Sequence, residues 1–258
     1  MNAQDRAALT QASKGSIAVF ESVVPQATLG AINRMLDAAY AATQDHEQFF
    51  GSAKDVVHTL RDIPAFKTLE NEAVRAASEW LKSTMPVNAA VGPWFGLRIG
   101  SSTTTAGSHC RHFDSHVLTL VIVLKTASDQ EKSGDLVVYP KTRGIPRRRD
   151  NLLRKSVQWG ERGLPFPLRA ARTERHLERG FCSRIRGFAG DVYVFNGFLM
   201  QHCNLDVLAG ERRSLIIHYL DPGLSLGLSA INRLRRHATA VPTDAVRPVE
   251  PVTGLDAL

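Results

Sequence analysis

Two stretches in the first third of the chain carry apolar residues at the spacing of an amphipathic helix. They are TLGAINRMLDAAYAAT (residues 28–43) and FKTLENEAVRAASEWLKST (residues 66–84). In each, the apolar side chains recur every three or four positions and fall on one face. These positions are Leu29, Ile32, Leu36 and Tyr40 in the first stretch, and Phe66, Leu69, Ala73, Ala77 and Trp80 in the second. We therefore expect two helices that pack against the outside of a sheet.

The segment between these helices, HEQFFGSAKDVVHTLRDIPA (residues 46–65), carries loop signals and is predicted to be irregular. It contains two adjacent phenylalanines, Phe49 and Phe50. Large aromatic side chains are most often buried, so a place in the core is favoured over a place at a substrate mouth.

Further along the chain, short apolar runs and strict alternation replace the helical pattern. The run from Val117 to Leu124 is β-branched and too short to span a membrane, so it predicts a buried strand. GERRSLIIHYL (residues 210–220) alternates, and alternate residues of a strand share a face. One face carries Arg212, Ser214, Ile216 and His218, and the other carries Arg213, Leu215, Ile217 and Tyr219. We expect the face of Arg212 to point inward.

Length and composition fit one globular domain. The chain has 258 residues, of which 43% are hydrophobic, enough for a substantial core. We expect helical support in residues 1–90, a β core in residues 91–225, and a helix and tail in residues 226–258. Neither a signal peptide nor a membrane span is visible. Cys110, Cys182 and Cys203 are an odd number without zinc-type spacing, which indicates packing roles in a reducing cytoplasm.

Three residues have the spacing and chemistry of a metal site. His112 and Asp114 are two positions apart, so on a strand both side chains point to the same face. His202 begins another candidate strand and can supply a third ligand from across a barrel. Two imidazoles and one carboxylate leave positions open on the metal, as in non-haem iron(II) oxygenases. His109 and His116 compete as ligands, and His112 is preferred because of its spacing to Asp114.

Ten residues after His202 lies Arg212, which the alternation buries. A buried guanidinium needs an anionic partner, and its planar shape suits a carboxylate. Two other residues have alternative roles. His218 shares the face of Arg212 and is favoured as a structural histidine over a co-substrate contact. Arg98, in the strand-like WFGLRIG, is predicted either to face an anionic substrate inside the barrel or to be solvated or salt-bridged.

Four motifs follow one another between about Trp94 and Leu220. They are the HxD pair of His112 and Asp114, SGDLVVYP (residues 133–140), GDVYVFNG (residues 190–197), and the spacing of His202, Val207, Gly210 and Arg212. In this order they resemble the iron(II)/2-oxoglutarate-dependent dioxygenases, especially the prolyl 4-hydroxylase-like branch. Asp206 departs from the family, which commonly has proline before the residue matching Val207.

The resemblance implies a fold, a cofactor set and ligands. The fold is an all-β core with flanking helices, a double-stranded β-helix of the jelly-roll, cupin-like kind. Iron(II) is expected on His112, Asp114 and His202. The distal carboxylate of 2-oxoglutarate is expected on Arg212, with Ser214 as an added hydroxyl donor. With oxygen, such an enzyme hydroxylates an unactivated C–H bond and releases succinate and CO2.

The segment from Lys141 to Arg186 is the most basic part of the chain, with 14 Lys or Arg residues against four acidic ones. As an insertion between barrel strands, it is predicted to be a mobile lid whose arginines, Arg147, Arg148 and Arg149 among them, select the substrate rather than support the fold. Such a run also fits nucleic-acid binding or a merely solvated face. Its aromatic residues are sparse, which argues against a platform for stacking bases.

The sequence therefore predicts a hydroxylase with a small polar or anionic substrate, such as an amino acid or a biosynthetic intermediate, and no membrane partner. One alternative is an oxygenase acting on a nucleobase or nucleic acid through the basic insertion. The other is a metal-binding jelly roll without turnover. That alternative leaves Arg212 without a role. The sequence leaves the oligomeric state open.

Overall fold

The computed structural model describes residues 1–42, 49–85, 92–102, 107–127, 134–140, 144–145, 160–161 and 163–223, with side chains from 41–42 and 49–52 left out. The elements follow in the order α1 (Ala3–Ser13), β1 (Ile17–Phe20), α2 (Gln26–Ala42), α3 (Phe49–Arg61), α4 (Pro64–Thr84), β2 (Trp94–Ser101), β3 (Leu118–Lys125), β4 (Leu136–Val138), α6 (Phe166–Glu178), β5 (Ser183–Ile185), β6 (Val192–Phe195), β7 (His202–Asn204) and β8 (Glu211–Tyr219).

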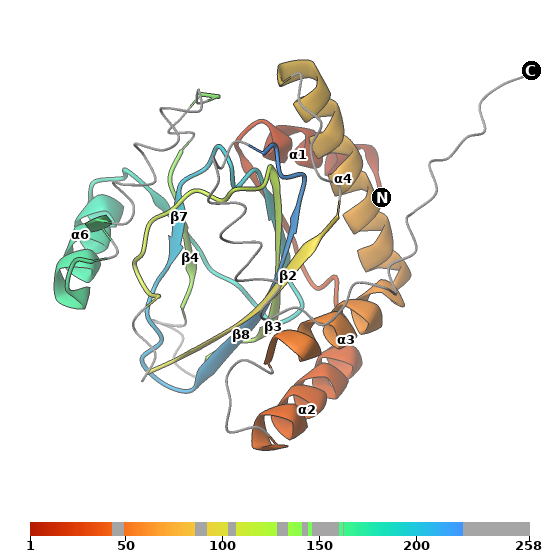
Figure 1. Ribbon diagram of the computed structural model, residues 1–258, viewed down its shortest axis with the longest axis horizontal. Helices are drawn as coiled ribbons and strands as arrows, with labels where there is room; N and C mark the ends of the chain where they lie inside the picture. The colour runs from red at the N-terminus through yellow and green to blue at the C-terminus, as the bar shows by residue number, and fades with distance from the viewer. Residues whose placement is uncertain are drawn as a thin grey trace, which may run out of the picture.

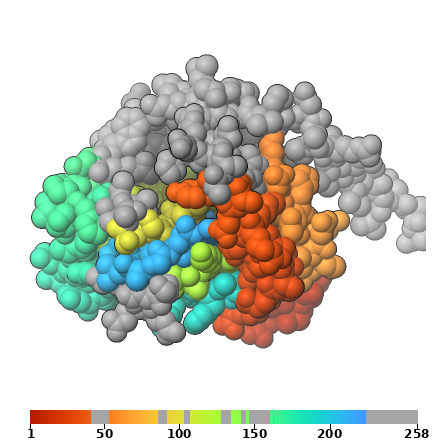
Figure 2. Space-filling view, turned by 90° about the horizontal axis from the view of Figure 1, so that it is seen from below, coloured from red at the N-terminus to blue at the C-terminus, as the bar shows by residue number. Residues whose placement is uncertain are grey.

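The strands form two antiparallel sheets, which confirms the predicted double-stranded β-helix. The larger sheet has the order β1-β6-β3-β8-β2, and the smaller has the order β5-β4-β7. The N-terminal helices cover one side of the molecule, and α6 lies on the other, beside β4 and β7 (Figure 1). Figure 2 shows the same arrangement from below, with β2 in yellow and β8 in blue between α6 and the helices.

The central strand β3 is buried on both faces, as its apolar run predicts. Leu118, Leu120 and Ile122 pack with the helices in the main core. Val121 and Val123 point the other way, into a second cluster between the sheets. This alternation divides the interior into a helix-facing core and a barrel interior.

Both predicted helices are present, and one predicted loop is a helix. Leu29, Ile32 and Leu36 are buried on α2, although Tyr40 at its end is exposed rather than part of the core. The segment predicted to be irregular forms α3 instead. Its buried face consists of Ala53, Val56, Val57 and Leu60. Residues 46–48 and the side chains of Phe49 and Phe50 lie outside the described part, so the choice between core and substrate mouth stays a prediction.

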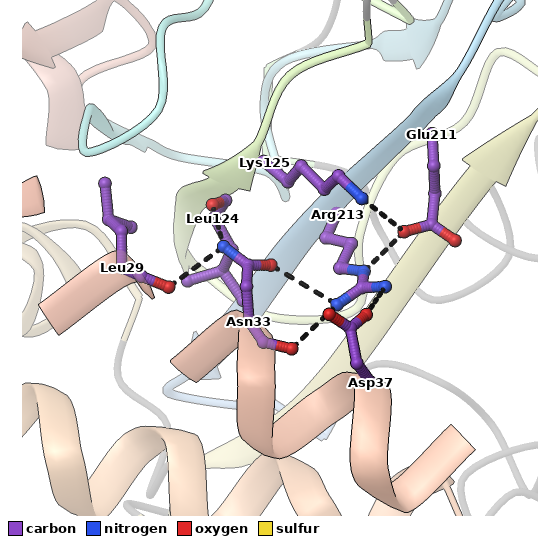
Figure 3. Close-up of polar contacts among 7 residues, drawn as sticks. All are labelled: Leu29, Asn33, Asp37, Leu124, Lys125, Glu211 and Arg213. Carbon is purple, nitrogen blue, oxygen red and sulfur yellow. Dashed lines mark hydrogen bonds and ion pairs between the residues drawn. The ribbon is translucent and has the colours of Figure 1, made fainter. Parts of the chain in front are cut away.

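A polar network ties α2 to the outer face of the sheet (Figure 3). Arg213 donates to Asp37 of α2, to the neighbouring Glu211, and to the main-chain carbonyl of Asn33 at 3.2 Å. The side-chain amide of Asn33 in turn donates to the carbonyl of Leu124 at 2.8 Å. Arg213 thus faces away from the barrel, as predicted, but it is buried beneath a helix.

The N-terminal region also contributes directly to the sheet. Strand β1 pairs with β6 in antiparallel register from Ile17 opposite Phe195 to Phe20 opposite Val192. Within the described residues, no helix is long and apolar enough to cross a membrane. Residues 226–258, predicted as a C-terminal helix and tail, lie outside the described part.

The basic insertion contains regular structure where it is described. Helix α6 packs Leu177 against a small cluster that includes Tyr139 and Cys203, on the outer face of the smaller sheet. Arg169 of α6 is 8% exposed and contacts the thiol of Cys110. Arg184 pairs with the buried Asp135 at 2.6 Å. For these two arginines, the expectation that the insertion does not support the fold is wrong.

Candidate metal centre

Three side chains converge between the two sheets. His112, Asp114 and His202 bring their ligand atoms within 4.8 Å of one another. Nε2 of His112 lies 3.7 Å from Oδ1 of Asp114, and Nε2 of His202 lies 3.7 Å from Oδ2 of the same carboxylate. Two imidazole nitrogens and one carboxylate at these separations can hold one divalent ion from one side. Among the described residues this is the single group of such ligands found.

Main-chain carbonyls orient both histidines. Nδ1 of His112 lies 2.9 Å from the carbonyl oxygen of Cys110, and Nδ1 of His202 lies 3.2 Å from that of Met200. A carbonyl oxygen only accepts, so each Nδ1 carries a proton and each Nε2 offers its lone pair. Burial, and then the nearby His202, lower the pKa of His112 to about 3. The imidazole is therefore neutral at neutral pH, which is the form that binds a metal.

The carboxylate of Asp114 is held ionised and in place. Burial acts to raise its pKa, but the three neighbouring histidines and the hydroxyl of Thr119 outweigh it and hold the pKa well below its usual range. Thr119 donates to Oδ2 at 2.6 Å. The approach of the Gly197 backbone is so close that a Cβ there would lie 2.0 Å from Oδ2. Glycine at position 197, just after β6, therefore leaves room for the Asp114 carboxylate.

The two ligand-bearing segments are joined through their backbones. The N–H of His112 donates to the carbonyl of His202 at 2.9 Å, and the N–H of His202 donates to the carbonyl of His112 at 3.0 Å. This is an isolated bridge, because regular strand β3 begins only at Leu118. The HxD pair was predicted within a strand, and it lies instead in the segment that precedes one.

Arg212 and Ser214 lie on the inner face of β8, as predicted. Arg212 is 8% exposed and donates to the hydroxyl of Ser214 at 3.4 Å. The negative charge of Asp135 acts on Arg212, but that carboxylate is already paired with Arg184. Among the described residues, no carboxylate makes an ion pair with Arg212. A buried guanidinium in such surroundings is suited to an anionic ligand.

One cavity joins the metal ligands to this strand. Its lining includes the three ligands, the polar residues Arg98, Thr119, Ser214 and His218, and the apolar residues Val121, Leu136 and Ile216. Arg98 on β2 is paired in register with Ser214, and although largely exposed it reaches this cavity. Arg98 thus combines the two predicted environments, because it lines the cavity and is also exposed to solvent.

Three other histidines of the described chain, His109, His116 and His218, do not belong to the group of metal ligands. Nε2 of His109 lies 3.1 Å from Oδ1 of Asp206. Asp206, which stands where the family commonly has proline, therefore has a buried hydrogen-bond partner. His116 stacks on His218 with 5.1 Å between ring centroids. Nδ1 of His218 lies 3.0 Å from the hydroxyl of Thr119. His218 therefore lines the cavity as well as supporting the site, a wider role than the structural one the sequence favoured.

Thr119 is a site residue that the sequence analysis missed. Its only hydroxyl proton is directed to Asp114, so it accepts a hydrogen bond from Nδ1–H of His218. The signal available in the sequence was a single hydroxyl within the apolar run of β3, on the same face as Val121. Arg147, Arg148 and Arg149 lie outside the described residues, and their contact with a substrate stays a prediction.

Comparison with family models and with curated protein sequences gives no match for this chain. Solved structures do match. EvdO2 from Micromonospora carbonacea var. aurantiaca, complexed with 2-oxoglutarate, has a TM-score of 0.52 at 15% identity, covering 86% of this chain and 91% of that one. The non-heme alpha-ketoglutarate-dependent carbocyclase SnoK from nogalamycin biosynthesis has a TM-score of 0.50 at 11% identity, with coverages of 90% and 91%.

A prolyl 4-hydroxylase structure from Phytophthora capsici also has a TM-score of 0.50 at 11% identity, and the match covers 91% of this chain and 72% of that one. This chain has the fold of the iron(II)/2-oxoglutarate-dependent oxygenases. At these identities the likeness concerns the fold, and the chemistry must be argued from the residues. In this oxygenase fold the donor set of two imidazole nitrogens and one carboxylate fits iron(II).

Proposed function

We propose that the protein is an iron(II)- and 2-oxoglutarate-dependent oxygenase that hydroxylates a C–H bond of a small polar or anionic substrate. One observation carries the proposal: a preformed group of two imidazoles and a carboxylate lies in the same β-helix interior as the inner face of β8, where the buried Arg212 makes no ion pair with any carboxylate of the described residues. A metal-binding jelly roll without turnover accounts for the first feature and leaves the second unexplained.

In this proposal the residues have separate tasks. His112, Asp114 and His202 hold the metal through Nε2, a carboxylate oxygen and Nε2 respectively. Thr119 fixes the orientation of the Asp114 carboxylate. Arg212 and Ser214 bind the distal carboxylate of 2-oxoglutarate. When bound, iron and co-substrate supply the oxidation in which 2-oxoglutarate, O2 and the substrate C–H become succinate, CO2 and a hydroxylated product.

The cavity supports a small substrate with a polar or negative group. Val121, Leu136 and Ile216 give it apolar walls, and His218 and Asn204 add polar groups. Arg98 brings a positive charge to the same space. A carboxylate or phosphate on the substrate is therefore expected to bind beside Arg98, which orients the C–H bond toward the metal.

The test is substrate-free turnover of 2-oxoglutarate. Purified protein with iron(II), ascorbate and oxygen should release succinate slowly from 2-oxoglutarate, and a library of amino acids and small acids should contain a compound that accelerates it. His202→Ala should abolish succinate release, while the exposed His58→Ala provides a matched control with wild-type rates. No succinate from wild-type protein under any of these conditions would reject the oxygenase assignment. Acceleration only by oligonucleotides would instead favour a nucleic-acid substrate.

A further inference from the structure

Tyr193 on β6 carries a buried polar atom that the proposed chemistry has not used. Its side chain is fully buried, and its hydroxyl has no hydrogen-bond partner among the described residues. Most buried hydroxyl groups in proteins are hydrogen-bonded, and an unpaired one lowers stability. A phenylalanine would fill the same space without that cost. The hydroxyl therefore calls for an explanation.

The strand register places this phenol inside the barrel. Val121 of β3 is opposite Tyr193 on one side and opposite Ile216 of β8 on the other. Residues opposite one another in a ladder point to the same face, and Val121 and Ile216 both line the cavity. Tyr193 and the inner face of β8, including Arg212, therefore face the same interior.

Tyr193 and Arg212 also act on each other electrostatically. Burial raises the pKa of the Tyr193 phenol, while the charge of Arg212 acts to lower it. The phenol stays protonated at neutral pH and is available as a donor. Ser214, which accepts from Arg212, brings a second hydroxyl to the same place. The inner faces of β6 and β8 thus contribute one guanidinium and two hydroxyls, a set of donors suited to an oxyanion.

The backbone around the phenol is shaped to accommodate its oxygen. A Cβ at position 187 would lie 1.9 Å from the Tyr193 oxygen and 3.1 Å from its Cζ. The collision would be mainly with the hydroxyl rather than with the ring. Glycine at position 187 therefore provides space for an oxygen that makes no hydrogen bond within the described protein.

We propose that the hydroxyl of Tyr193 donates a hydrogen bond to the distal carboxylate of 2-oxoglutarate, beside Arg212. Tyr193 is then a binding residue for the co-substrate, contributed by β6 rather than by β8. The inference rests on the proposed function, since it names a further residue of that co-substrate site. It also explains why the ligand-free protein keeps a buried phenol without a partner.

The test compares Tyr193→Phe with wild-type protein by calorimetric titration of 2-oxoglutarate into iron(II)-loaded protein without oxygen. Loss of one hydrogen bond to a charged group should raise the Kd roughly ten- to hundred-fold. The melting temperature of the ligand-free variant should equal or exceed that of wild type, because an unpaired polar atom has been removed. 2-Oxopentanoate, which has a methyl group in place of the distal carboxylate, should bind equally weakly to both proteins.

The outcomes separate the inference from the proposed function. Wild-type protein that binds no 2-oxoglutarate rejects the proposed function and this inference with it. If wild type binds 2-oxoglutarate and the Kd of Tyr193→Phe is within two-fold of the wild-type value, the hydroxyl does not contribute to binding and the inference is wrong. Gly187→Ala provides a second measurement if that variant fails to fold. It should weaken binding when Tyr193 is present, and equal binding by Gly187→Ala and wild type would overturn the inference.

Discussion

Arg212 and Arg213 are neighbours on β8, but their side chains point to opposite faces of the sheet. Their alanine variants should therefore have opposite effects: one should lower stability, and the other should weaken co-substrate binding. Arg213→Ala removes the link between β8 and α2 and should lower stability while leaving co-substrate binding near wild type. Arg212→Ala removes a buried charge that forms no ion pair within the described part of the chain, and it should leave stability unchanged or improved. It should weaken 2-oxoglutarate binding by about 2–4 kcal/mol.

The expected loss for Arg213→Ala follows from the exposure of its partners. The side chain of Arg213 is 5% exposed, but those of Glu211 and Asp37 are 27% and 60% exposed. Removing one partner of a fully buried pair costs about 3–5 kcal/mol. Because water can hydrate both carboxylates here, we expect about 2 kcal/mol. At about 2–4 °C per kcal/mol for a chain of this size, the melting temperature should fall by about 4–8 °C.

Two assays on the same preparations test this division. Urea unfolding followed by circular dichroism gives the free energy of unfolding, and anaerobic calorimetry gives the Kd for 2-oxoglutarate. Arg175→Ala, on the exposed face of α6, serves as an arginine control. Weakened co-substrate binding by Arg213→Ala together with normal binding by Arg212→Ala would show that the inner and outer faces of β8 have been assigned in reverse.

Three further predictions concern the metal ligands and the insertion. Asp114→Ala removes the one carboxylate found in the metal site among the described residues, and it should abolish succinate release with an unchanged circular dichroism spectrum. Full activity would contradict the ligand assignment. Metal-free protein should lose stability as pH falls from 6.5 toward 4. Burial lowers the folded-state pKa of His112 to about 3 and that of His218 to about 4. The unfolded chain therefore binds more protons than the folded protein in that interval. A urea midpoint independent of pH in this range would argue against buried neutral histidines. Neutralising Arg147, Arg148 and Arg149 together should preserve the melting temperature and substrate-free succinate release but weaken substrate binding in a salt-dependent way; unchanged affinity would make them a solvated face.

The sequence predicted most of the site because its ligands belong to short motifs with fixed spacing. The alternation of β8 was sufficient to place Arg212 inward and Arg213 outward. It could not show that α2 covers Arg213, because Asp37 lies 176 residues earlier in the chain. Thr119 was missed for a related reason. Its contact with His218 joins β3 to β8, and local periodicity does not encode strand order.

The error over α3 has a different physical origin. Its glycine, serine and aspartate suggested a loop, whereas Ala53, Val56, Val57 and Leu60 form a narrow apolar face that is buried completely. Tertiary packing thus overrode weak local propensity. The HxD pair was placed within a strand for a similar reason. The first residue of β3 is set by hydrogen bonds to the neighbouring strands, and the local sequence does not show where those bonds begin.

The reciprocal backbone hydrogen bonds between His112 and His202 have a consequence for metal exchange. They hold the two ligand-bearing segments together by contacts that do not involve the ion, so the shape of the site is set by folding rather than by metal binding. Chelation should therefore yield a folded, reloadable protein, and different divalent ions should compete for one pre-shaped set of ligands. Occupancy in a cell would then follow the supply of each metal and the order of intrinsic affinities.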